Sequence, residues 1–177
     1  MAEGLLRHRL DALEVDIDVA SAGFTLEDRP ADRKAVKAAE RLGASLSGHR
    51  SRIVTPAMID ESMIIVGMVR KHVREVLDLC PDAKERSFTL KELVTRGRDV
   101  GPMQDHESAP DWIGRASADR DKLVHIGAGA DTDIDDPIGR SSRFFQSTAH
   151  EIDGLISELI TFWWPELAEE HELFSTK

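Results

Sequence analysis

The segment DIDDPIG at residues 133–139 carries residue types that acid–base chemistry uses. Asp135 and Asp136 precede Pro137, and a carboxyl group in such a loop can protonate a leaving oxygen and later activate a water molecule. Asp and Pro also favour ordinary turns. On spacing alone, an acidic turn is therefore the simpler interpretation.

A metal site is a second interpretation of the same acids. Asp131, Asp133 and Asp135 alternate as the first ligands of a calcium loop do. Such a loop needs Gly at its sixth position and Glu at its twelfth, where this sequence has Asp136 and Ser142. We therefore expect no metal here, and the sequence predicts no cofactor.

The single cysteine, Cys80, begins a Cys-x5-Arg pattern that ends at Arg86. A thiolate that attacks phosphorus needs a ring of inward-facing backbone N–H groups. Pro81 has no N–H, Asp82 and Glu85 would repel a phosphate, and the segment lacks a glycine for a tight turn. We therefore predict that Cys80 is a half-buried thiol at a helix end and not a nucleophile.

Composition excludes several classes of protein. One cysteine rules out a disulfide framework and favours a reducing compartment, so we expect a cytoplasmic location. A net charge of −10 argues against a nucleic-acid partner, which needs clustered Lys and Arg. The apolar run at 63–68 is too short to span a membrane, so no membrane partner is expected. With 177 residues, the chain fits a single domain, 1–177.

Apolar periodicity predicts alternating strands and helices along the chain. Strands are predicted at 15–23, 62–66 and 86–90. One helix is predicted to begin almost at residue 1, and others at 31–43, 69–79, 90–97 and 143–163. This order predicts an α/β fold of three layers, with a short parallel sheet of about four strands flanked by helices. The polar stretch at 97–131 is predicted to be an irregular surface insertion with a helical part near 110–123.

Six pieces of the sequence, in order, resemble the low-molecular-weight protein tyrosine phosphatases and the related arsenate reductases. They are MAEGLLRHRL, ASAG at 20–23, LSGHRSR at 46–52, IIVGMVRKHVREVL, FTLKEL and DIDDPIG. The resemblance covers nearly the whole chain apart from the insertion at 97–131.

The resemblance implies hydrolysis of phosphomonoesters through a phosphocysteine intermediate. In that family the phosphate-binding loop, Cys-x5-Arg followed by Ser-Pro, comes immediately before a helix that begins like MAEGLL. We therefore expect the true start to lie upstream of Met1. The family's first central strand and its nucleophile loop are then absent from these 177 residues, and the chain by itself is predicted to be inactive.

The resemblance also implies roles for residues whose function spacing leaves open. Asp136 matches the family's general acid, and Asp135 is the second choice. Ser21 and His49 match positions that hydrogen-bond the phosphate loop and hold its shape. Without the resemblance, they would be a strand-end serine and an exposed turn histidine. The implied partner is a phosphorylated protein or a small phosphomonoester.

Substrate and function keep alternatives open. Tyrosine-specific members of the family have aromatic residues around the pocket, whereas here only Phe24 is aromatic and Ile138 follows Asp-Pro. Phosphotyrosine, phosphoarginine and arsenate therefore all stay open as substrates. A protein tyrosine phosphatase-type hydrolase is the main prediction, and a non-catalytic binding or regulatory module is the alternative. An arsenate reductase is a further alternative, which the single cysteine disfavours.

Overall fold

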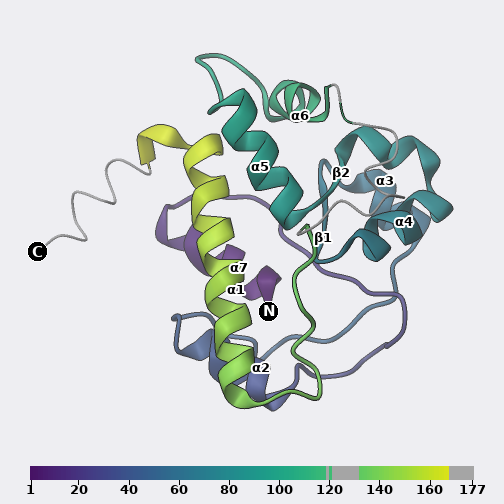
Figure 1. Ribbon diagram of the computed structural model, residues 1–177, viewed down its shortest axis with the longest axis vertical. Coiled ribbons are helices and arrows are strands. Elements are labelled where there is room, and N and C mark those ends of the chain that lie inside the picture. Colours follow the sequence, from purple (N-terminus) through teal and green to yellow (C-terminus); the bar gives the residue numbers. More distant parts are fainter. Residues whose placement is uncertain (119, 121–131, 168–177) are drawn as a thin grey trace, which may run out of the picture. The chain divides into compact units, whose positions relative to one another are not determined.

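Two compact units make up the chain in the computed structural model, which describes residues 1–118, 120 and 132–167 (Figure 1). The first unit consists of Met1–Val54 and Asp135–Ser157. The second consists of Thr55–Ile134 and Glu158–Lys177. The long helix α7 contributes its first part to the first unit and its last turns to the second.

Three helices build the first unit: α1 Ala2–Ala12, α2 Arg33–Glu40 and α7 Ser142–Trp163. The part of α7 up to Ser157 belongs to the first unit. Ala38 of α2 packs against Phe145 and Ala149 of α7, and all three are buried. Arg9 of α1 donates two hydrogen bonds to Asp153 of α7, at 2.7 and 2.6 Å. The small side chain of Ala38 therefore lets α2 and α7 approach closely. The bidentate ion pair between Arg9 and Asp153 holds α1 against α7.

Helix α2 is confirmed, but it is shorter than the predicted 31–43. The carboxylate of Asp32 accepts a hydrogen bond from the backbone N–H of Lys34 (2.7 Å) and caps the N-terminus. Gly43 has a φ of +83°, the left-handed conformation that glycine adopts without strain, and it turns the chain away after the helix.

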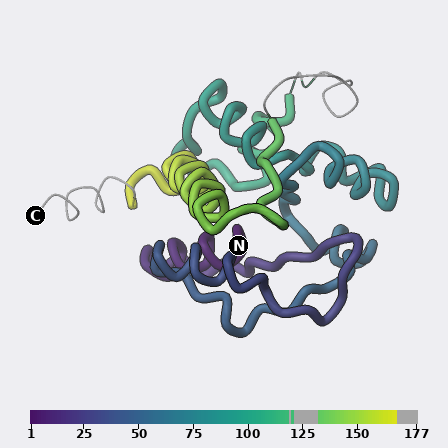
Figure 2. The backbone as a smooth tube through the Cα atoms, turned by 60° about the horizontal axis from the view of Figure 1, so that its bottom comes forward, coloured from purple at the N-terminus to yellow at the C-terminus, as the bar shows by residue number. Residues whose placement is uncertain are grey.

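The strand predicted at 15–23 is wrong. In this fully described stretch one parallel bridge, between Gly23 and Ile53, pairs the chain with another segment. The rest runs as an irregular loop between α1 and α2 (Figure 2). Ile17 is 39% exposed and Val15 and Val19 are only partly buried, so the alternating apolar residues find no buried face. Without a buried face and a neighbouring strand, β structure is not stabilised.

The second unit is built on two short parallel strands, with Val66 opposite Phe88. Its elements are α3 Pro56–Glu61, β1 Ile65–Gly67, α4 Arg70–Leu79, the 3₁₀ helix η1 Pro81–Arg86, β2 Ser87–Thr89, α5 Leu90–Val100 and α6 Ala109–Ser117. The predicted strand–helix–strand crossover is confirmed here. The described residues form a sheet of two strands, so the prediction of about four strands is wrong. Residues 15–23, which were predicted as a strand, contribute only the isolated bridge between Gly23 and Ile53.

Helix α6 confirms the helical part predicted near 110–123, but it is buried and not part of an irregular surface stretch. Trp112 of α6 is fully buried in a core with Phe88 and Leu93, and its indole N–H donates to the carbonyl oxygen of Gly101 (2.9 Å). The polar composition of the stretch does not predict that α6 is buried, because a single tryptophan supplies as much apolar area as several smaller residues. The rest of that stretch, 119 and 121–131, lies outside the described residues.

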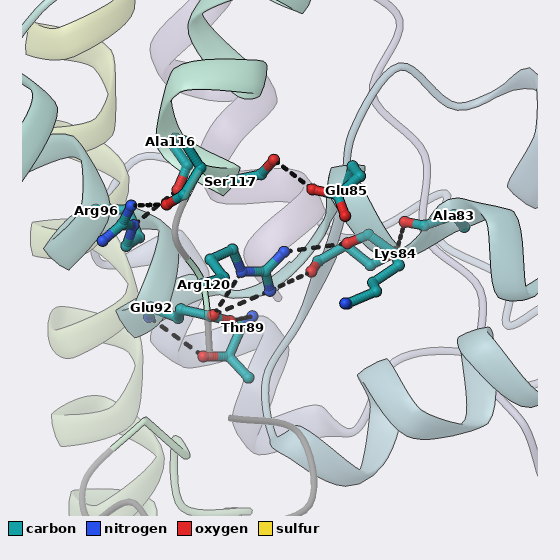
Figure 3. A network of polar contacts seen from close by, with 11 residues as sticks. Ala83, Lys84, Glu85, Thr89, Glu92, Arg96, Ala116, Ser117 and Arg120 are labelled. Atoms are coloured by element: carbon teal, nitrogen blue, oxygen red, sulfur yellow. Dashed lines mark hydrogen bonds and ion pairs between the residues drawn. The ribbon is translucent and has the colours of Figure 1, made fainter. Parts of the chain in front are cut away.

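A buried polar network joins β2, α5 and the end of α6 (Figure 3). The guanidinium of Arg120 forms an ion pair with Glu92 (2.9 Å), and these side chains are only 5% and 8% exposed. It also donates to the carbonyl oxygens of Lys84 (3.0 Å) and Ser87 (2.8 Å) and lies over the ring of Phe88. The carbonyl oxygens of Lys84 in η1 and Ser87 in β2 are thereby hydrogen-bonded inside the unit.

Helix α7 confirms the predicted terminal helix within one residue. Near its end Trp163 is buried and meets Trp112 edge-on, with ring centroids 5.7 Å apart. Among the helices that the structure describes, none has the length and apolar character needed to cross a bilayer.

Candidate functional site

One carboxylate in the first turn of α1 gathers the two predicted supporting residues. The hydroxyl of Ser21 donates to Glu3, and Nδ1 of His49 lies 3.3 Å from the same carboxylate oxygen. The other carboxylate oxygen is 2.7 Å from the guanidinium of Arg7. The structure thus brings Ser21 and His49 together at Glu3, whose side chain is 12% exposed.

The charge of Glu3 is stabilised by these neighbours. Burial raises the pKa of the Glu3 carboxyl, but the Ser21 hydrogen bond and the charges of Arg7 and His49 outweigh burial, so the pKa lies below its ordinary value. Glu3 is therefore ionised at neutral pH and acts as an acceptor that orients both side chains.

Backbone pairing holds Ser21 and His49 at this carboxylate. The N–H of Gly23 donates to the carbonyl oxygen of Arg52 (2.8 Å), and the N–H of Val54 donates to that of Gly23 (2.9 Å). The guanidinium of Arg52 donates to the carbonyl oxygen of Ser21 (3.1 Å). These hydrogen bonds hold the two irregular segments side by side.

Gly4 explains how α1 comes close enough. A Cβ at this position would clash with the side chain of Leu46 and lie 3.3 Å from the carbonyl oxygen of Ser45. A glycine next to Glu3 therefore lets the first turn of α1 contact the segment that leads to His49.

An open pocket of about 260 Å³ lies beside this cluster within the first unit. Its lining includes hydroxyl, imidazole and guanidinium groups, and consists of Ser21, Ala22, Gly23, Thr25, Leu26, His49, Ser51 and Arg52. These groups are hydrogen-bond donors that suit a small anion.

The predicted acids lie in a separate turn of the first unit. The carboxylate of Asp136 accepts a hydrogen bond from the N–H of Ile138 (2.9 Å), and Asp135 and Asp136 are both exposed. Gly139 follows with a φ of +79°. Among the described residues no hydrogen bond or ion pair joins Asp136 to the Ser21 cluster, so its role as general acid stays a prediction.

Sequence reasoning missed Asp133 as an anchor of the second unit. Its carboxylate accepts hydrogen bonds from the backbone N–H of Arg70 (2.8 Å) and from the guanidinium of Arg70 (3.3 Å). Ile134 then donates to the carbonyl oxygen of Met68 (2.8 Å). Burial raises the pKa of Asp133, but the contacts with Arg70 outweigh burial and the pKa is lowered. The spacing of the acids in DIDDPIG contains no signal that singles out Asp133 for this role.

Cys80 ends α4 in the second unit and is partly buried. Its N–H donates to the carbonyl oxygen of Val76 (2.8 Å), and its own carbonyl accepts from Ala83 (3.0 Å). Arg86 donates to the carbonyl oxygen of Ile59 (3.0 Å). The residues between Cys80 and Arg86 thus form a 3₁₀ helix, whose amides bond along the chain.

No metal ligand set is present in the part of the chain that the structure describes, where no three His, Cys, Asp or Glu side chains gather. Asp131, the first acid of the calcium interpretation, lies outside the described residues.

Two comparisons with known proteins, one with family models and one with individual relatives, point to the same family. Residues 1–105 match the family model of the low molecular weight phosphotyrosine protein phosphatases. A relative from Klebsiella pneumoniae that carries this family's name is 32% identical over 93 residues, which are 52% of this chain and 65% of the relative. The chain therefore spans slightly less than two thirds of that relative's length.

Solved structures share the fold. The low molecular weight protein tyrosine phosphatase from T. tengcongensis superimposes with a TM-score of 0.67 and 25% identity, over 90% of this chain and 86% of that one. The YwlE arginine phosphatase from Geobacillus stearothermophilus gives a TM-score of 0.63 and 23% identity, over 98% and 84%. Because the family model matches more than half of its residues, the chain belongs to the low molecular weight phosphotyrosine protein phosphatase family.

Proposed function

We propose that the chain forms most of a protein tyrosine phosphatase-type hydrolase, which works through a phosphocysteine intermediate. The Glu3–Ser21–His49 cluster, beside a pocket with hydrogen-bond donors in its lining, carries this proposal. An ionised carboxylate that fixes a hydroxyl and an imidazole is a rigid support for a phosphate-binding loop, and rigid support keeps donors aimed at the phosphate. The partner proposed is a phosphorylated protein or a small phosphomonoester.

Asp136 is proposed as the general acid. As a carboxylic acid, it would protonate the leaving oxygen of the ester, and the resulting carboxylate would then take a proton from the water that attacks the phosphocysteine. Its exposed turn leaves the carboxyl accessible to a bound ester. Asp135 is the second choice for this role.

The nucleophile is proposed to come from outside these 177 residues, with the family's first strand and phosphate loop. Cys80 is the single cysteine, and Arg86 is engaged by the carbonyl oxygen of Ile59. Neither is arranged as a phosphate cradle, which needs free amides and a free guanidinium. The 177 residues alone are therefore expected not to hydrolyse phosphate esters.

The test joins a segment with one strand and a Cys-x5-Arg-Ser-Pro loop in front of Met1. Hydrolysis of a phosphotyrosine peptide is followed for this longer chain and for the 177 residues alone. We expect turnover by the longer chain only, and a loss of about a hundredfold to ten-thousandfold in kcat for its Asp136→Asn variant. The matched Asp135→Asn variant is expected to keep most of the activity.

Two results would contradict the proposal. One is turnover by the 177 residues that Cys80→Ser abolishes, since Cys80 would then be the nucleophile. The other is a longer chain that is folded by circular dichroism and binds the phosphopeptide without hydrolysing it, which would favour a binding or regulatory module.

A further inference from the structure

Basic residues are concentrated in one part of an acidic chain. Residues 29–52 contain seven of the 23 Lys and Arg residues but two of the 33 Asp and Glu residues. Sixteen basic residues stand against 31 acidic ones elsewhere. A local excess of this size is a surface that attracts anions, and it lies entirely in the first unit.

Helix α2 arranges part of this charge in a line. Its alanine face packs on α7, while Arg33, Lys37 and Arg41 are exposed at i, i+4 and i+8. We call these three residues the basic stripe. Arg41 follows the last helical residue and keeps helical backbone angles, so it continues the same face.

The charges of the basic stripe repel each other along the helix. Like charges four residues apart are unfavourable, and Arg33 at the N-terminus also opposes the helix dipole, whereas the dipole favours Lys37 and Arg41 at the other end. The first turn of α2 has no acidic residue, and within the described residues no ion pair reaches any member of the basic stripe. By contrast, Arg9 and Arg98 each have a carboxylate partner.

The same unit carries a complementary acidic segment. Glu14, Asp16 and Asp18 occupy alternate positions of the irregular loop after α1, and all three are exposed. In the described chain none of these acids forms an ion pair. We call these three residues the acidic segment, and Asp16 and Asp18 lie in the stretch predicted as a strand, where no neighbouring strand is found.

The two sets match in spacing. Residues four apart in a helix are separated by about 6 Å along its axis. Alternate residues of an extended chain are separated by about 6.6 Å. Asp16 and Asp18 can therefore align with two neighbouring cations of the basic stripe, and Glu14 lies in the turn just before them, with a φ of +56°.

We propose that the basic stripe of one molecule binds the acidic segment of a second copy of this chain. This inference is independent of the proposed hydrolysis. A nucleic-acid strand fits the basic stripe less well, since the stripe has no aromatic side chain for stacking. A membrane surface also fits less well, because the apolar face of α2 is already buried.

Paired charge reversals test this contact by sedimentation at low ionic strength. One variant reverses the basic stripe (R33E/K37E/R41E), and the other reverses the acidic segment (E14K/D16K/D18K). Each variant alone is expected to lose at least about tenfold in association, because like charges now meet. An equimolar mixture of the two is expected to associate as wild type does, since both contacts are again attractive.

The control K71E/R98E/R143E changes net charge by the same amount as the stripe variant and is expected to associate nearly as wild type. Equal losses in the control and the stripe variant would overturn the proposal, as would a mixture that stays monomeric. A labelled peptide of residues 11–20 provides a measurement that does not depend on folded variants. It must bind wild type in a salt-sensitive way, and its failure to bind would also overturn the proposal.

Discussion

Glu3 connects α1 to two irregular segments of the first unit through one carboxylate. Ser21 and His49 share one of its oxygens, and Arg7 contacts the other. Hydrogen bonds to a charged acceptor are stronger than those between neutral groups, so much of the order around the pocket depends on this ionised side chain.

Replacing Glu3 by Gln is expected to destabilise the first unit by about 1 kcal/mol. The amide keeps the shape of the side chain but loses its charge, and it adds an N–H₂ group next to Arg7. Urea unfolding measures the change. Glu27→Gln, at an exposed position, is the matched control, and equal unfolding midpoints for the two variants would contradict the role of Glu3.

The sequence alone does not identify Glu3. Ser21 and His49 were predicted from motif positions, but an acid in the first turn of a helix is common because the helix dipole favours it. Glu3 can act as the acceptor because Gly4 next to it lets Leu46 approach α1. This is a tertiary contact, which the sequence does not reveal. Similarly, nothing in the spacing of DIDD distinguishes the anchoring Asp133 from the exposed Asp136.

The elements of the second unit depend on the buried pair of Arg120 and Glu92. We expect Arg120→Met to destabilise the protein by about 3–5 kcal/mol. The methionine would leave Glu92 charged and unpaired and would remove the donor from the carbonyl oxygens of Lys84 and Ser87. Chemical unfolding followed by tryptophan fluorescence measures the loss, since Trp112 reports on the same core.

Arg98→Met is the matched control for this prediction. The Arg98–Glu158 pair has short contacts but more exposed side chains, at 56% and 34%, so its loss is expected to destabilise the protein much less than the loss of Arg120. If Arg120→Met lowered the free energy of unfolding no more than Arg98→Met does, the claim that the Arg120 network holds the end of α6 in place would be contradicted.

Helices could be predicted from the sequence better than strands. The apolar spacing of α4, α5 and α7 marks a face that each helix buries, and a helix satisfies its own backbone groups. The segment at 15–23 has an equally clear alternation, but a strand needs a partner elsewhere in the chain. Residue spacing carries no information about that partner, which is why this prediction was wrong.

Acid stability is a property of the molecule as a whole. Glu107 and Glu158 have lowered pKa values, mainly because arginine side chains donate hydrogen bonds to them. The pKa values of Glu3 and Asp133 are also lowered, since their partners outweigh burial. A carboxyl whose folded pKa is depressed stabilises the fold above its ordinary pKa of about 4 and loses this effect as the pH falls through the folded value.

We therefore expect the melting temperature to be nearly constant from about pH 7 to pH 5 and to fall steeply towards about pH 3. Thermal melts by circular dichroism at constant ionic strength measure this. Glu158→Gln is expected to flatten part of the decline, because it removes one titrating group. A melting temperature that rises on acidification would contradict the assigned directions.

Mass spectrometry of the intact protein during turnover tests the phosphocysteine mechanism most directly. The Asp136→Asn variant of the loop-bearing chain is mixed with an ester whose leaving group needs no protonation. The first step can then proceed, while the second lacks its base. The mechanism predicts that one phosphoryl group accumulates on the loop cysteine. Continued turnover with no phosphoryl adduct, or an adduct on Cys80, would contradict it.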